Sequence, residues 1–174
     1  MKKLITLILA LALAAATFAQ SAKKPLIVYF SRYSNTDFAP NVDATSSASI
    51  VAKDGGREGS TEHIARMIQS RTGGDIELLR TKQKYDADFN AVVRQNRAES
   101  EKNAFPALEK LTLNPKDYDI VFIGYPIWNM TTPRAVQTFL RDNDLSGKTV
   151  IPFCTHAGSG NAGTQSKIQS VIPN

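Results

Sequence analysis

The sequence predicts an α/β fold in which a parallel β-sheet carries helices on both faces. Three apolar runs, at 25–30, 118–124 and 149–154, show no alternation of polar and apolar residues. Strands that are buried on both faces have this pattern, which is typical of parallel sheets. Segments with helical signals separate the runs, so strands and helices alternate along the chain. The 174 residues are enough for one domain.

The expected elements can be placed in chain order from these signals. They are a strand at 25–30, a helix starting at 60, a strand at 75–81, a helix at 88–103, a strand at 118–124, a helix at 132–140, a strand at 149–154 and a helix at 162–171. The segment 37–59 is rich in Asp, Ala, Ser and Gly without a helical period, so we expect a long loop there.

The helices differ in the signals that predict them. The first has a Ser or Thr cap at 60–61, an acid in its first turn, Ile64 and Ile68 four residues apart, and a stop at the glycine pair 73–74. In the second, the pattern places Phe89, Val92 and Val93 on the inward side. Pro133 suits the first turn of the third.

Residues 1–20 have the pattern of a secretory signal peptide. A basic start is followed by an apolar run from Leu4 to Ala16 and by the small residues Thr17 and Ala19. The run is shorter than the ~20 residues that span a bilayer. We therefore expect export without stable membrane insertion, to a bacterial periplasm, with residues 21–174 forming the mature domain.

Composition excludes several classes of function. The 21 basic and 16 acidic residues give a net charge of +5, which falls to +3 once Lys2 and Lys3 are removed with the signal peptide. No basic run is interleaved with aromatic residues, so we expect no nucleic-acid partner. Cys154 is the single cysteine and there are two histidines, which excludes a disulfide framework and argues against a metal site.

The segments that follow the apolar strands are the place to look for a ligand site, because parallel sheets bind ligands beyond the carboxyl ends of their strands. Residues 31–36 carry hydroxyls and a guanidinium, and a helix N-terminus with two hydroxyls follows at 60–61. The loop 125–132 bears aromatic side chains, and 155–163 is rich in glycine. Together these segments predict a site for a phosphorylated flat ring.

Four segments resemble the flavodoxin-like proteins, which bind flavin mononucleotide (FMN), and they occur in the family order. They are 27–36, 59–65, 118–128 and 145–160. The resemblance covers 25–174 and implies a doubly wound sheet of strand order 2-1-3-4. It implies these cofactor-binding residues: Ser31, Arg32, Ser34, Asn35, Thr36, Ser60 and Thr61 around the phosphate; Pro126, Ile127, Trp128, Asn129 and Met130 over one flavin face; and Thr155, His156, Gly158 and Gly160 beside the ring.

The resemblance implies a secreted FMN-binding electron-transfer protein without catalytic or metal-binding residues of its own. Its partner would be a redox protein or a small electron acceptor. Two alternatives remain open. The first is a flavin-dependent reductase of quinones or other small acceptors, and the second is a binding module of the same fold that retains no flavin.

The chain differs from the family pattern in two places. Residues 37–59 separate the two halves of the phosphate site, whereas the family loop runs straight into its helix. Family members also continue into a fifth strand and a final helix. We therefore expect a four-stranded sheet with 149–154 at an edge, of low stability or prone to self-association.

Three features have competing interpretations. Trp128 is interpreted as the flavin wall, the alternative being an ordinary core tryptophan. The spacing Gly158-x-Gly160-x-x-Gly163 fits a dinucleotide fingerprint literally, but it follows a late strand and no acid comes after it. Cys154 and His156 are interpreted as a buried thiol beside a site histidine rather than as a nucleophile-base pair.

Overall fold

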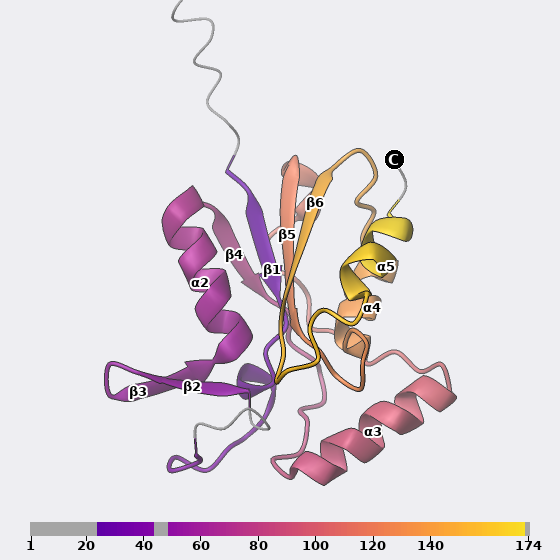
Figure 1. Ribbon diagram of the computed structural model, residues 1–174. Coiled ribbons are helices and arrows are strands. Elements are labelled where there is room, and N and C mark those ends of the chain that lie inside the picture. Colours follow the sequence, from indigo (N-terminus) through magenta and orange to yellow (C-terminus); the bar gives the residue numbers. More distant parts are fainter. Residues whose placement is uncertain (1–23, 44–48, 173–174) are drawn as a thin grey trace, which may run out of the picture.

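The computed structural model describes residues 24–43 and 49–172. Its main sheet confirms the predicted α/β class and strand order (Figure 1). The strands are β1 (Leu26–Tyr29), β4 (Asp75–Leu78), β5 (Ile120–Pro126) and β6 (Thr149–Thr155). They are parallel and lie in the order β4-β1-β5-β6, which is 2-1-3-4 when the strands of this sheet are counted along the chain.

Strand β1 lies at the centre of the sheet. Tyr29 is paired with Leu78 of β4 on one side and with Gly124 of β5 on the other. All four residues of β1 are at most 4% exposed. Its unbroken apolar sequence is explained by burial on both faces. In β6, at the edge, every residue is at least partly exposed.

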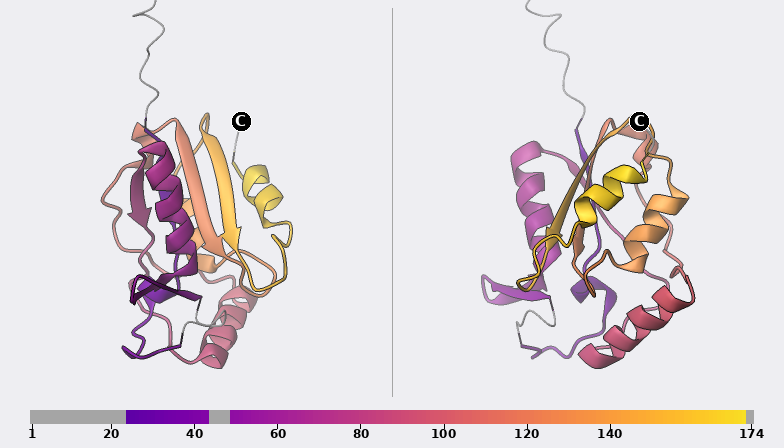
Figure 2. Two further views of the ribbon diagram at one scale, coloured as in Figure 1. Left: turned by 60° about the vertical axis from the view of Figure 1, so that its left-hand side comes forward. Right: turned by 45° about the vertical axis from the view of Figure 1, so that its right-hand side comes forward.

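The four α-helices of the described residues are distributed unequally over the two faces (Figures 1 and 2). They are α2 (Ser60–Thr72), α3 (Phe89–Glu101), α4 (Arg134–Asp142) and α5 (Thr164–Ser170). Helix α2 packs on one face, and the other three lie on the opposite side. The predicted stop of α2 is confirmed, because Gly73 adopts a φ of 66° and donates its N–H to the Gln69 carbonyl.

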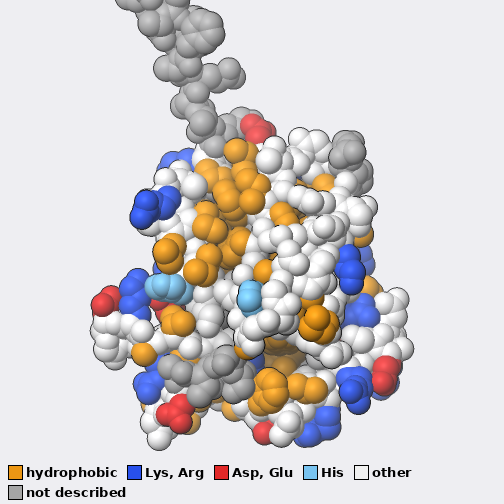
Figure 3. All heavy atoms as spheres, viewed as in Figure 1, with side chains coloured by type: hydrophobic (Ala, Val, Ile, Leu, Met, Phe, Trp, Pro, Cys, Tyr) orange, Lys and Arg blue, Asp and Glu red, His pale blue; other side chains and the backbone are white. Residues whose placement is uncertain are grey.

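The larger core lies between the sheet and helices α3 to α5. Val121, Ile123 and Tyr125 of β5 contribute to it and are fully buried, as is Phe139 of α4. The smaller core, under α2, consists of Ile27, Tyr29 and Ala65 with partly buried neighbours that include Phe122 and Phe153. Figure 3 shows the hydrophobic side chains that remain visible over the sheet beside α2.

The segment 37–59 is not a continuous loop, and this part of the prediction is wrong. It contains an antiparallel hairpin of β2 (Ile50–Lys53) and β3 (Gly56–Gly59). The turn between them has φ values of 49° at Asp54 and 77° at Gly55. Asp-Gly favours such two-residue turns, so the signal was present in the sequence.

Helix α3 also differs from the prediction in its buried side. Val92 is 5% exposed, but Phe89 and Val93 are 49% and 41% exposed. The inward stripe continues from Val92 to the buried Asn96. The helix lies beside the end of the sheet (Figure 1), so only this narrow stripe is buried, and Phe89 at its N-terminus is half exposed.

Candidate functional site

A cavity of about 370 Å³ lies where the carboxyl ends of β5 and β6 meet the start of α2. This volume is within the ordinary range for small-molecule sites. Its lining residues are Ser49, Ser60, Phe89, Pro126, Ile127, Trp128, Thr155, His156 and Ala157. The structure thus brings six predicted site residues, from three separate segments, to the edge of the sheet where parallel folds bind ligands.

Trp128 is both a core residue and a wall of this cavity. Its ring meets Phe30 at 5.3 Å and 88°, and Tyr85 at 5.1 Å and 87°, both edge to face. These contacts fix the plane of the indole. The side chain packs on the larger core and is only partly buried, so the two interpretations of Trp128 are compatible.

A two-residue turn holds Trp128 in place. The N–H of Trp128 donates to the Thr131 carbonyl and the N–H of Thr131 donates to the Trp128 carbonyl, each at 2.9 Å. Asn129 and Met130 form the tip, with φ values of 46° and 61°. Both are exposed, and neither lines the 370 Å³ cavity.

The N-terminus of α2 reaches the cavity through hydroxyl side chains. The Thr61 and Thr155 hydroxyls are hydrogen-bonded at 2.8 Å and join the helix to the end of β6. The Ser60 N–H donates to the Ser49 carbonyl at 2.7 Å, which ties the hairpin to the helix start. Within the described residues, the N–H groups of Thr61 and Glu62 have no acceptor, as expected in a first helical turn.

Ser31 lies directly against this helix start. Its Oγ is buried and has no hydrogen-bond partner among the described residues. A Cβ built on Gly59, the residue before α2, would lie 1.9 Å from Ser31 Oγ. A hydroxyl without a partner beside a helix N-terminus is suited to an anionic oxygen.

Three other residues predicted for the phosphate end make contacts within the protein. Asn35 donates to the Ser31 and Leu79 carbonyls and accepts from the Thr81 N–H and hydroxyl. The guanidinium of Arg32 donates to the Asp86 and Ala87 carbonyls. Ser34 donates to Glu62 in a different cavity.

Arg32 and Tyr85 lie near Trp128, and their surroundings shift the pKa of each. Burial lowers the pKa of Arg32, opposed by the nearby Asp86 and Asp88. Burial raises the pKa of Tyr85, and Glu99 adds to the rise, so the phenol stays protonated.

Thr36 and the loop after β6 complete the predicted set. The Thr36 hydroxyl is buried and has no partner among the described residues. In the loop, His156 Nδ1 accepts from the N–H groups of Gly158 and Gly160, at 3.1 and 3.3 Å. These two donors therefore face the imidazole, and His156 is exposed together with the next three residues of the loop.

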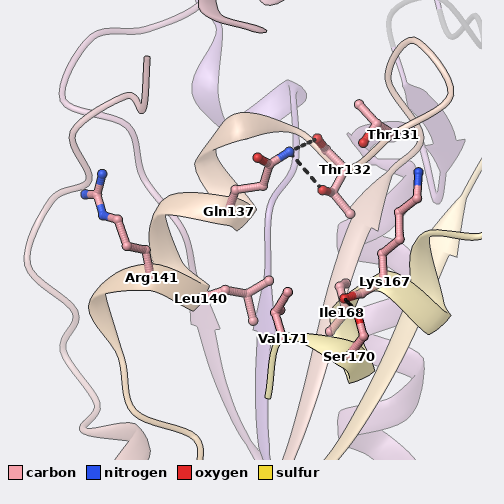
Figure 4. Close-up of a pocket in the computed structure, with 9 residues that line it drawn as sticks. All are labelled: Thr131, Thr132, Gln137, Leu140, Arg141, Lys167, Ile168, Ser170 and Val171. Atoms are coloured by element: carbon pink, nitrogen blue, oxygen red, sulfur yellow. Dashed lines mark hydrogen bonds between the residues drawn. The ribbon is translucent and has the colours of Figure 1, made fainter. Parts of the chain in front are cut away.

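A larger cavity, of about 560 Å³, lies elsewhere, between α4 and α5 (Figure 4). Leu140, Ile168 and Val171 lie near one another there, and the Gln137 amide donates to the backbone and side chain of Thr132. None of its nine lining residues is aromatic. It also contains none of the predicted site residues, so the smaller cavity beside Trp128 is the better candidate.

Sequence reasoning missed three contributors to the site. Phe89 was expected in the core, and the helical period gave no sign of its outward position. Gly59 permits the contact between Ser31 and α2, which depends on a long-range approach. Ser49 reaches the cavity through the hairpin that was expected to be a loop.

Comparison with known proteins identifies the family of this chain. The family model described as flavodoxin matches residues 49–174. A protein from Bacteroides uniformis described as a flavoprotein is 26% identical with a TM-score of 0.62, covering 84% of this chain and 81% of its own. A similar protein from Bacteroides eggerthii is 27% identical with a TM-score of 0.60, covering 84% and 79%.

A flavoprotein from Lactobacillus acidophilus, crystallised in complex with FMN, shares the fold at 21% identity and a TM-score of 0.62, covering 86% of each chain. No curated protein matches the sequence significantly. The family model covers well over half of the residues. The chain therefore belongs to the flavodoxin family.

Proposed function

We propose that this protein holds FMN at the carboxyl edge of its sheet and transfers electrons to a redox partner protein or a small acceptor. The observation that carries this proposal is the cavity that joins Trp128, the loop after β6 and the start of α2 in a member of the flavodoxin family. FMN in the relative from L. acidophilus supports the same choice of cofactor.

The residues at this edge suit the two ends of FMN. Trp128 offers a flat apolar wall whose plane is fixed by two aromatic neighbours. At the start of α2, the unpartnered Ser31 hydroxyl and the N–H groups of Thr61 and Glu62 are suited to a phosphate. A flat wall and an anion cradle at the same edge are what a phosphorylated ring requires.

FMN supplies one-electron and two-electron redox chemistry when it is bound. The chain supplies position and environment. Trp128 and Ile127 exclude water from one side of the cavity, and His156 and Thr155 border another. A wall with few charges disfavours a negatively charged ring, so these residues would set the reduction potential.

Binding of the phosphate can be tested by comparing FMN with riboflavin. We expect the purified protein to take up FMN and to show a flavin visible spectrum. Ser31→Ala should weaken FMN binding about 3- to 10-fold and leave riboflavin binding unchanged, since only FMN carries the phosphate. Ser34→Ala is the matched control, because its hydroxyl already donates to Glu62.

Two results would contradict this assignment. If neither flavin binds, the protein is a binding module of the flavodoxin fold without the cofactor. If Ser31→Ala weakens the binding of FMN and of riboflavin equally, the phosphate is bound elsewhere. Turnover with a nicotinamide donor and a quinone would instead identify a reductase.

We also propose that the protein is exported. The predicted signal peptide at 1–20 lies outside the described residues, and among the described helices none is long and apolar enough to cross a bilayer. Cell fractionation with N-terminal sequencing of the mature protein is the test. A start near Gln20 or Ser21 in the periplasmic fraction is expected, and an intact Met1 in the cytoplasmic fraction would refute export.

A further inference from the structure

A second, smaller cavity of about 110 Å³ lies on the α3 side of Trp128. It shares Phe89, Ile127 and Trp128 with the candidate flavin cavity, and its remaining walls include Arg32, Val92 and Asn96. An apolar cavity of about 150 Å³ is known to accommodate benzene. At about 110 Å³ the space beside α3 is smaller than that cavity, so its occupant can be no larger than a single six-membered ring.

Asn96 provides the polar group of this cavity. The residue is 3% exposed, and its Oδ1 has no hydrogen-bond partner among the described residues. Most buried side-chain acceptors in proteins are satisfied. An occupant of the cavity that donates one hydrogen bond would satisfy this acceptor.

The other walls suit a flat apolar occupant. Trp128 is held edge-on by Phe30 and Tyr85, so its ring cannot collapse into the space. Val92 is buried beside it, whereas Phe89 is 49% exposed and continues the apolar surface outward. The guanidinium of Arg32, held by two backbone carbonyls, adds a fixed positive charge that favours an oxygen on the same ligand.

We propose that this cavity binds a small aromatic alcohol, a ring of phenol or hydroquinone size whose hydroxyl donates to Asn96 Oδ1. The site is separate from the phosphate end of the flavin cavity and does not require a bound flavin. When FMN is present, the shared Trp128 and Phe89 place such a ring next to the proposed cofactor.

Phenol and fluorobenzene are suitable probes, because they have nearly the same shape and only phenol has a donor. Trp128 is the single tryptophan, so its emission reports directly on the cavity, with calorimetry as an independent measurement. We expect saturable binding of phenol to the purified protein, with and without FMN. Asn96→Leu should weaken the binding of phenol about 3- to 10-fold. The binding of fluorobenzene and of FMN should stay within about twofold of the wild-type value.

The matched control is Asn90→Leu, at an exposed position on the same helix, which should change the affinity of neither phenol nor fluorobenzene. Absence of saturable phenol binding would overturn the proposal, as would equal losses for both probes in Asn96→Leu. Either result would mean that Asn96 does not bind the hydroxyl of an aromatic ligand. If Asn96→Leu does not fold, the wild-type protein decides: tighter binding of fluorobenzene than of phenol would refute a hydrogen bond to Asn96.

Discussion

The two faces of the sheet differ in how completely they are covered. On the face toward α3, α4 and α5, Val121, Ile123 and Tyr125 of β5 are fully buried. On the face toward α2, Phe122 and Phe153 are only partly buried, and Ile151 is 38% exposed. Alternate residues of the same strands are therefore buried to different extents on the two faces of the sheet. The closed face should dominate stability, whereas the open face can adapt to changes in side-chain size.

The largest expected effect is on the closed face. Phe139→Ala removes a fully buried ring from α4, and we expect it to lower the free energy of unfolding by about 3–5 kcal/mol. Urea unfolding measures the change. A loss below about 1 kcal/mol would mean that α4 does not contribute to the cooperative core.

The next effect tests the capacity of the open face to adapt. A Cβ on Gly124 would lie 2.1 Å from Phe153 Cζ, so Gly124→Ala must displace the ring. We expect a cost of about 1–3 kcal/mol. In the background of Phe153→Ala the cost should nearly vanish, because nothing remains to be displaced. Additive costs in this double-mutant cycle would show that the strain lies in the backbone of β5.

The next, smaller effect is the loss of stability at alkaline pH that the ionisation of Tyr29 causes. Burial raises the pKa of Tyr29 to about 12, and Glu62 adds to the rise. Because an unfolded tyrosine loses its proton near pH ~10, stability is full below that pH and falls between about 10 and 12. Tyr29→Phe should reduce this fall by about 1 kcal/mol at pH ~11, measured by urea unfolding across pH. Identical slopes would show that Tyr29 titrates normally.

The smallest effect belongs to the edge of the open face. Ile151→Lys should change the free energy of unfolding by less than about 0.5 kcal/mol, since the side chain is already exposed. It should also reduce any self-association through β6, because an edge lysine opposes strand pairing. Size-exclusion chromatography over a range of concentrations measures this. Unchanged self-association would place the contact elsewhere.

The contrast between the faces explains which parts of the fold were predictable. The apolar runs of β1 and β5 predicted buried parallel strands, and both are central in the sheet. The run in β6 looks the same in sequence, but the strand lies at an edge and none of its residues is fully covered. An apolar run in the sequence predicts a strand, but the exposure of that strand depends on which strands and helices lie beside it in the fold.

The candidate site was predictable to a similar extent. The loops after β5 and β6 could be located because they follow strong strands, and Trp128 stood out as the single tryptophan. The different roles of Ser31, Ser34 and Asn35 could not be assigned. All three are small polar residues in one short loop, and only long-range contacts distinguish a hydroxyl without a partner from one already bound.

The Asn35 amide has a consequence for ligand binding in general. By bonding Ser31, Leu79 and Thr81, it fastens the loop after β1 to the end of β4 before any ligand arrives. A ligand that meets this loop therefore loses little affinity to the entropy of ordering it. The Thr81 amide should accordingly exchange slowly with deuterium in the free protein, and at nearly the same rate when the site is full.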